Sequence, residues 1–193
     1  MSIWYGANVA DESELRLCGD LAGKRVIELG IASHPNSIDI ALSGAKAMAL
    51  DLDAQAITAL RAAAERHEVK VECHQGDLAD IGFATSASVD LVIASHSLAA
   101  VDDLPRVLRQ VHRVLKIGAP FVVAMQHPVA TMFAADHSLR YAYGAASLTF
   151  SELYLAFERS NFHFDMIHEL DDRRVREPLT PSVLVLRARK QGV

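Results

Sequence analysis

The chain has few of the features that mark secreted or membrane proteins. Only two of its 193 residues are cysteines, Cys18 and Cys73, and their separation fits no metal or redox motif. We therefore expect two free thiols in a reducing compartment. No apolar run approaches the length of a membrane span, and the N-terminus has no apolar segment of the signal-peptide type. These absences predict a cytoplasmic protein that has no membrane partner.

Clustered positive charge is missing as well. The formal net charge is -5 at pH 7 and the sequence pI is about 6.0. Nucleic-acid surfaces concentrate lysine and arginine, so we expect no nucleic-acid partner. The basic residues are scattered except for Arg173, Arg174 and Arg176, which share one predicted loop. This loop could meet an anionic substrate, although a solvated loop is the simpler interpretation.

Several enzyme signatures are absent. The chain has no P-loop, no nucleophile elbow and no zinc-site spacing. The dinucleotide motif Gly-x-Gly-x-x-Gly would need glycines at positions 30, 32 and 35, where the chain has Gly30, Ala32 and Pro35. This pattern excludes an ordinary nicotinamide-dependent dehydrogenase.

The composition is that of a globular protein. Hydrophobic residues make up 51% of the chain and charged residues 22%, which is enough apolar surface for a packed core. The length fits one domain, so we interpret residues 1–193 as a single domain.

Strand-like and helix-like patterns alternate along most of the chain, which predicts a parallel α/β sheet. The expected strands are 25–29, 46–50, 69–74, 89–94 and 120–125, and the expected helices are 11–21, 36–44, 54–67 and 103–115.

The C-terminal part has a different pattern. A helix at 151–160 is followed by two strand-like stretches, 163–170 and 182–189, with about a dozen residues between them. A parallel crossover would need a helix there, and Pro178 and Pro181 oppose one. We therefore predict that these two strands pair antiparallel.

Residues 25–53 carry the strongest functional signal. An apolar strand ends in Glu28-Leu29-Gly30, a helix follows, and the next apolar strand ends at Asp51. Ligands of such units bind outside the carboxyl ends of the strands, where glycine permits close approach of the backbone. Asp51 could accept hydrogen bonds from both hydroxyls of a ribose. The alternative is that an acid here caps the next helix, a role for which Asp53 is also placed.

Further segments follow in a characteristic order: Ala49-Leu50-Asp51-Leu52-Asp53, His74-Gln75-Gly76-Asp77-Leu78, Val89-Asp90-Leu91-Val92 with Ser95, Arg113-Val114-Leu115-Lys116-Ile117-Gly118 and His127-Pro128. With Glu28-Leu29-Gly30, this order resembles the class I S-adenosylmethionine-dependent methyltransferases, in particular the small single-domain bacterial type (methyltransferase type 11-like). The resemblance implies a seven-stranded Rossmann-like sheet, parallel except for an antiparallel last strand, with helices on both faces. It also implies S-adenosyl-L-methionine as the cofactor and a small-molecule substrate. Whether the protein forms a homodimer is left open.

The resemblance also implies roles for individual residues. Residues 1–23 would form an N-terminal lid or helix, and residues 127–150 would form a short cap over the substrate. The cofactor would be contacted at its methionine end by Gly30, Ala32 and Ser95, at the ribose by Asp51, and at the adenine by Leu52, Asp77 and Leu78.

The turn after the first strand departs from the family pattern. Ala32 and His34 stand where the family has glycines. If position 34 required a positive φ, His34 would be strained by on the order of 1 kcal/mol. These departures leave an alternative function open, in which a methyltransferase-fold protein no longer uses the cofactor and acts as a binding or regulatory subunit.

Three histidines follow the carboxyl ends of neighbouring predicted strands: His34, His96 and His127. They could bind a metal or supply a general base. Their spacing does not support a metal site, and we predict none. His127 is our candidate for a catalytic, substrate-facing group. Trp4 and Tyr5 could form an aromatic lid or could pack as ordinary N-terminal residues.

Overall fold

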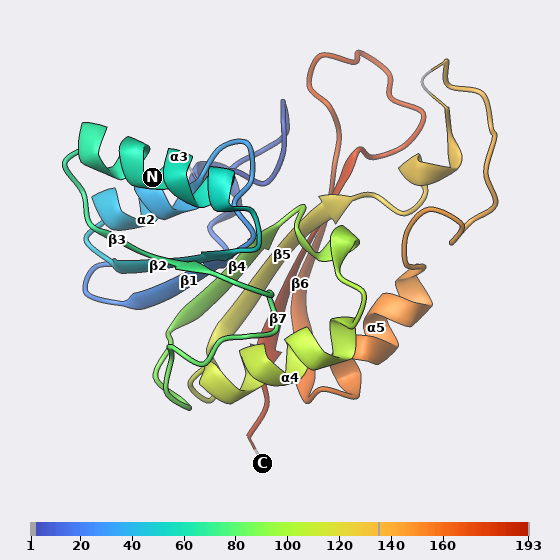
Figure 1. Cartoon of the computed structure of the whole chain (residues 1–193). Helices are drawn as coiled ribbons and strands as arrows, with labels where there is room; N and C mark the ends of the chain where they lie inside the picture. The colour runs from blue at the N-terminus through green and yellow to red at the C-terminus, as the bar shows by residue number, and fades with distance from the viewer. Residues whose placement is uncertain (1–2, 135, 193) are drawn as a thin grey trace.

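The computed structural model describes residues 3–134 and 136–192. A single seven-stranded sheet with the strand order β3-β2-β1-β4-β5-β7-β6 forms its centre (Figure 1). The strands are β1 (Arg25–Leu29), β2 (Lys46–Asp51), β3 (Val71–Gln75), β4 (Leu91–Ser95), β5 (Pro120–Gln126), β6 (Phe162–Leu170) and β7 (Val183–Lys190). β7 pairs antiparallel with both β5 and β6, while the other pairs are parallel. The predicted fold class and the predicted antiparallel pairing of the last two strands are both confirmed.

Helices cover the two faces of this sheet. α2 and α3 lie against one face together with the N-terminal segment, and α4 and α5 lie against the other (Figure 1). The helices are α1 (Glu12–Leu15), α2 (Asn36–Leu42), α3 (Ala54–Arg66), α4 (Leu104–Val114) and α5 (Phe150–Glu158), with two 3-10 turns, η1 (Leu98–Ala100) and η2 (Ala130–Met132). Within the described part of the chain, no helix has the length and apolarity needed to cross a membrane.

The predicted helix over 11–21 is wrong, because α1 ends after one turn. Arg16 adopts a left-handed conformation with φ 52° and closes the helix. The buried carboxylate of Glu12 then accepts hydrogen bonds from the backbone N–H groups of Leu17 (2.9 Å) and Cys18 (2.7 Å). This side chain replaces the helical partners of those groups, so the chain continues as an irregular segment. The apolar side chains of Leu17, Cys18 and Leu21 are still buried in the core, and Leu15 is partly buried against it.

The central strands are apolar because both of their faces are covered. Every residue of β4 is buried, and β5 is buried from Phe121 to Met125. Strand limits shift by one or two residues from the prediction; β3 begins at Val71 and β4 ends at Ser95. In this arrangement the carboxyl ends of β1, β2, β3 and β4 meet at one edge of the sheet.

Candidate functional site

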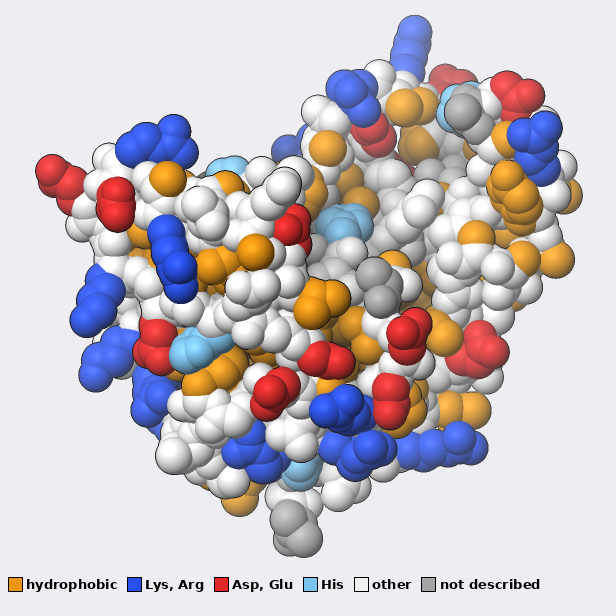
Figure 2. Space-filling model, viewed as in Figure 1, with side chains coloured by type: hydrophobic (Ala, Val, Ile, Leu, Met, Phe, Trp, Pro, Cys, Tyr) orange, Lys and Arg blue, Asp and Glu red, His pale blue; other side chains and the backbone are white. Residues whose placement is uncertain are grey.

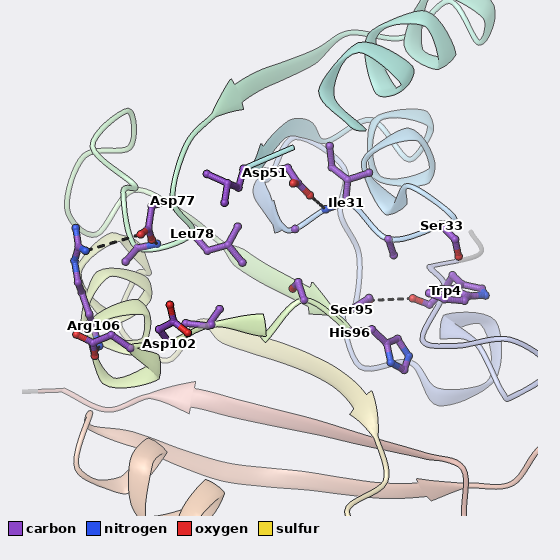
Figure 3. A pocket seen from close by; sticks show the side chains of 17 residues that line it. Trp4, Ile31, Ser33, Asp51, Asp77, Leu78, Ser95, His96, Asp102 and Arg106 are labelled. Atoms are coloured by element: carbon purple, nitrogen blue, oxygen red, sulfur yellow. Dashed lines mark hydrogen bonds and ion pairs between the residues drawn. The ribbon is translucent and has the colours of Figure 1, made fainter. Parts of the chain in front are cut away.

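A cleft of about 650 Å³ opens at this edge of the sheet. Its volume lies within the range of small-molecule sites, and its position is that expected for a ligand of an open α/β sheet. Figure 2 shows the molecule hollowed between the α2–α3 side and the segments that follow β5 and β6, and Figure 3 shows the cleft from close by. The lining residues come from the N-terminal segment, the carboxyl ends of β2 and β4, the loops after β1, β2, β3 and β4, and the first turn of α4: Trp4, Gly30, Ile31, Ala32, Ser33, Asp51, Leu52, Asp77, Leu78, Ala79, Ser95, His96, Ser97, Val101, Asp102, Asp103 and Arg106.

Gly30 turns the chain from β1 into the cleft. Its φ of +71° is a conformation that glycine adopts freely and other residues avoid. A Cβ at this position would lie 2.2 Å from the Cβ of Ser97, which is far inside contact distance. The backbone N–H of Gly30 donates to the carbonyl of Leu50 over 2.8 Å, so the turn is fixed to β2. Glycine is therefore required here for both backbone and packing reasons.

Asp51 ends β2 and faces the turn. Its Oδ2 accepts the backbone N–H of Ile31 at 2.5 Å (Figure 3). Its Oδ1 accepts the backbone N–H of Asp53 at 2.7 Å. A carboxylate offers about four acceptor positions, so about two of them stay open to the cleft. Asp53 caps α3 by accepting the N–H of Gln55 at 2.8 Å. The two acids thus divide the alternatives considered from sequence, with Asp53 as the helix cap and Asp51 in the cleft.

The predicted adenine residues lie together at one end of the cleft. Leu52 lines it and is 72% exposed, which leaves its apolar side chain free to cover a planar ring. Asp77 lines it too; its Oδ1 accepts the N–H of Ala79 at 2.7 Å, and its Oδ2 lies 3.9 Å from Arg106. The neighbouring acid Asp80 is not part of the lining.

Leu78 completes this end of the cleft. Among the residues that the structure describes, no acceptor is hydrogen-bonded to its backbone N–H. An N–H group that lines a cleft without an internal partner can donate to a ligand. The predicted use of the Leu78 backbone is therefore compatible with the geometry.

At the other end, Ser95 is almost fully buried. Its hydroxyl donates to the carbonyl of Trp4 and accepts from Nδ2 of Asn36, each over 3.1 Å (Figure 3 shows the contact with Trp4). Ser95 therefore borders the cleft mainly as part of a polar network. Its predicted contact with a ligand stays a prediction.

This network holds the N-terminal segment against α2. The side-chain amide of Asn36 donates to the Trp4 carbonyl at 3.1 Å and accepts the Trp4 N–H at 2.7 Å. Beneath it, the Glu28 carboxylate accepts the backbone N–H groups of Asn36 (2.9 Å) and Ser37 (2.8 Å) as well as the Ser37 hydroxyl. Glu28 is fully buried, and burial raises its pKa to about 7. Sequence reasoning did not identify this network; a glutamate inside an apolar strand was the available signal.

The histidine in the turn points away from the cleft. Nε2 of His34 lies 2.9 Å from Oδ2 of Asp39, and the side chain is half-exposed. His34 and Pro35 instead line a second hollow of about 600 Å³ between α2 and α3, which Ala32 also borders. His34 is not among the residues with positive φ, so the strain considered from sequence does not arise. The turn therefore leaves the cleft open in spite of its missing glycines.

The three histidines do not form one site. His127 is buried; its Nε2 lies 2.9 Å from Oε1 of Glu169, and its Nδ1 accepts the backbone N–H of Val129 at 3.2 Å. It is not part of the cleft lining, and both ring nitrogens have partners, so its catalytic role stays a prediction. Nowhere in the described ranges do three or more His, Cys, Asp or Glu side chains gather as a metal site would require.

Of the other candidate residues from the sequence, some line the cleft and others do not. Trp4 lines the cleft, whereas Tyr5 is fully buried and its hydroxyl donates to Glu12 at 2.6 Å. Arg173 pairs with Glu14 and Arg174 with Asp172 on the surface, outside the cleft lining. Sequence analysis gave no cleft role to Ser97, Val101, Asp102 and Asp103 in the loop after β4, or to Arg106 in the first turn of α4. The position of this loop at the carboxyl end of a central strand was the signal for it.

Similarity to known proteins agrees with this geometry. The structure resembles an S-adenosylmethionine-dependent methyltransferase from Mesorhizobium loti, with a TM-score of 0.77 and 22% identity over 91% of this chain and 94% of that one. It also resembles S-adenosylmethionine-dependent methyltransferases from Methanosarcina mazei, with a TM-score of 0.69 and 17% identity over 88% of this chain and 93% of that one. At these identities the likeness shows the fold. No curated protein matches the chain.

The strand order and the cleft define the class I methyltransferase fold. Residues 27–123, half of the chain, match the model of a family described as a methyltransferase domain, and the chain belongs to this family of S-adenosylmethionine-dependent methyltransferases. S-adenosylmethionine is accordingly its cofactor.

The cleft fits this cofactor. Asp51 has acceptor positions that could take two ribose hydroxyls, and Leu52, Asp77 and the Leu78 N–H could serve as an apolar cover, an acceptor and a donor for an adenine. Ile31, Ala32 and Ser33 of the turn border the cleft, whereas His34 and Pro35 lie outside its lining.

We expect His34→Ala to leave the affinity for S-adenosylmethionine within about twofold of the parent, because His34 faces Asp39 and not the cleft. Isothermal titration calorimetry measures this directly, with Asp39→Ala as a matched variant of the same contact. A loss of tenfold or more in His34→Ala alone would contradict the placement of this side chain.

Proposed function

We propose that the protein is an enzyme that transfers a methyl group from S-adenosylmethionine to a small molecule. The observation that carries the proposal is Asp51, whose carboxylate is oriented by two backbone N–H groups and keeps about two acceptor positions open to the cleft. An acid that only stabilised the turn would not need to border a cleft of about 650 Å³.

The chain's own residues would bind and orient the reactants. When bound, S-adenosylmethionine supplies a methyl group on a positively charged sulfur. Asp51, Asp77 and Leu78 would hold the adenosine part, and Trp4 would shield the cleft from water on the side of Ser95. Methyl transfer depends mainly on alignment of the two reactants, which such fixed contacts provide.

The small size of the acceptor is inferred from the shape of the molecule. The segment between β5 and α5 is short, and η2 is its one helical element among the described residues. It leaves a hollow rather than an extended flat surface beside the cleft (Figure 2). A hollow of this kind suits a small molecule better than a macromolecular surface.

The alternative is a methyltransferase-fold protein that acts as a binding subunit without using the cofactor. The open turn supports the enzyme over this alternative, since His34 and Pro35 lie outside the cleft lining. Thermal unfolding with millimolar S-adenosylmethionine or S-adenosylhomocysteine distinguishes the two, because a ligand that binds the native state raises the Tm. The absence of any shift would favour the binding subunit.

We expect Asp51→Asn to weaken binding of S-adenosylmethionine by about 10- to 100-fold, the loss typical of hydrogen bonds to a charged group. The amide keeps one acceptor for the turn but loses the charge and the spare acceptor positions. Asp80→Asn, at an exposed acid outside the cleft lining, should bind like the parent. Calorimetric affinities that are equal for Asp51→Asn and the parent would rule out the ribose-binding role.

A further inference from the structure

His96 is held in an unusual backbone conformation directly after β4. Its φ is +60°, a left-handed conformation that few residues other than glycine adopt. Its backbone N–H donates to the carbonyl of Ala124 at 2.7 Å, which fixes it to β5. Conformations of this kind persist where the surroundings impose them, and they cluster at functional sites.

The contacts of the ring determine which nitrogen carries the proton. Nε2 lies 2.8 Å from the backbone carbonyl of Tyr5. A carbonyl oxygen only accepts, so Nε2 must donate its hydrogen, and in the neutral ring the lone pair is then on Nδ1. The N-terminal segment therefore fixes the tautomer of His96.

Nδ1 is available for a ligand. Within residues 3–134 and 136–192 no group is hydrogen-bonded to it, and the side-chain atoms there that are both buried and unpartnered are Nε2 of His112 and Nε2 of His168. Nδ1 of His96 is thus neither satisfied nor buried. His96 borders the cleft beside Ser95, and the centre of its ring lies 5.6 Å from that of the Trp4 ring (Figure 3).

His127 differs in each of these respects. It is buried, it lies outside the cleft lining, and each of its ring nitrogens has a partner. Of the two imidazoles, His96 is the one with a lone pair free and a place in the cleft.

We propose that Nδ1 of His96 is the base that receives the proton of the methyl acceptor, and that the acceptor carries this proton on a hydroxyl group. The inference rests on the proposed function. The hydroxyl oxygen forms the new bond to the methyl carbon, the carbon–sulfur bond breaks with its electron pair staying on sulfur, and the hydroxyl proton moves to Nδ1. A hydroxyl is the kind of acceptor that needs such a base, because it is a weak nucleophile while protonated.

The test uses the charge difference between S-adenosylmethionine and S-adenosylhomocysteine, so it does not require the acceptor. The methionine end of the cofactor is expected near Ser95, next to His96 in the cleft lining. A positive charge on His96 would therefore repel the sulfonium of the first ligand but not the neutral thioether of the second. We expect the affinity of the parent for S-adenosylmethionine, relative to S-adenosylhomocysteine, to fall by about tenfold or more from pH 8 to pH 5.5. The pH dependence of this ratio should be smaller in His96→Asn than in the parent, because asparagine tolerates a positive φ and does not titrate, whereas Glu28 is present in both proteins.

Other charged groups face the same region and are common to parent and variant: Asp51, Asp77, Asp102, Asp103 and Arg106 in the cleft, and Glu28 beneath the turn. The difference between parent and His96→Asn therefore reports His96. His67→Asn, which removes an exposed histidine at the end of α3, should keep the pH dependence of the parent.

Nitrogen-15 NMR of the imidazoles provides a second readout. We expect an unprotonated Nδ1 and a protonated Nε2 for His96 at pH 8, with resonances that respond differently to the two ligands. A protonated Nδ1, or an affinity ratio that is independent of pH in the parent, would overturn the assignment while leaving cofactor binding intact. Failure of both ligands to bind would overturn the proposed function and this inference with it.

Discussion

Replacement of Gly30 by alanine is expected to lower the free energy of unfolding by about 2–5 kcal/mol. A left-handed conformation costs a residue with a Cβ roughly 1–2 kcal/mol, and overpacking adds about 1–3 kcal/mol. Both terms apply here, since φ is +71° and the new Cβ would lie 2.2 Å from that of Ser97. Urea denaturation measures the loss, and binding of S-adenosylmethionine should fail because the turn must move.

Ser97→Gly provides a control that separates the two terms. In Gly30→Ala/Ser97→Gly the closest remaining atom is the Cα at position 97, 3.5 Å from the new Cβ. The stability lost through overpacking should therefore be recovered. The cost of the left-handed backbone conformation, about 1–2 kcal/mol, should remain. Ser97→Gly alone removes the hydroxyl that donates to the Leu29 carbonyl and serves as the reference for this cycle. Additive effects of the two substitutions would show that the contact with Ser97 does not limit position 30.

A pH dependence of stability is expected from Glu28. Burial raises its pKa in the folded protein to about 7, above the ordinary value of 4.5, so the native state binds the proton more tightly than the unfolded state. Between these values the native state holds more protons, and the free energy of unfolding falls as the pH rises, levelling off above about pH 7. The contribution lost over this range is on the order of 3 kcal/mol, from about 1.4 kcal/mol for each pH unit.

Glu28→Gln isolates this contribution, because glutamine does not titrate. The variant is expected to be less stable than the parent at pH 5, since the amide matches the three donors of Asn36 and Ser37 poorly. The difference in free energy of unfolding between the parent and Glu28→Gln should become smaller as the pH rises to 8, where the parent has lost the contribution of protonated Glu28. Urea denaturation at pH 5, 6, 7 and 8 measures this difference, and Glu65→Gln, at an exposed position, serves as the control. Parallel profiles for the parent and Glu28→Gln would contradict the assignment.

Much of the fold could be predicted from local patterns. Apolar strands alternating with amphipathic helices identified β1 to its terminal residues, and the proline-containing loop indicated the antiparallel β6–β7 pair. Helix 11–21 was predicted from the spacing of apolar residues, and that spacing is also satisfied by an irregular segment lying on a sheet. The hydrogen bonds from Glu12 that close α1 join side chain to backbone within a buried corner, which no periodicity encodes.

The candidate site likewise contains residues that could be predicted from the sequence and residues that could not. Spacing along the chain placed Gly30, Asp51, Leu52, Asp77 and Leu78 at the ends of successive strands, and parallel strands bring such ends together. The contributions of Trp4 and His96 depend on where the N-terminal segment lies against β4, a contact between residues 91 positions apart. The orientation of His34 was likewise open until its neighbour Asp39 was placed on α2.

The sequence by itself determined which strand is followed by a glycine, which strand ends in an acid, and which family these strand ends resemble. These features are local, because a strand end and the turn after it are set by a few adjacent residues. The tertiary structure alone decided that the cleft stays open without glycines at positions 32 and 34, and that Asn36, held by Glu28, binds the N-terminal segment to α2. It also decided that His96 rather than His127 borders the cleft. Burial and hydrogen-bond partners supplied from distant segments decide these outcomes, and only the packed molecule brings those segments together.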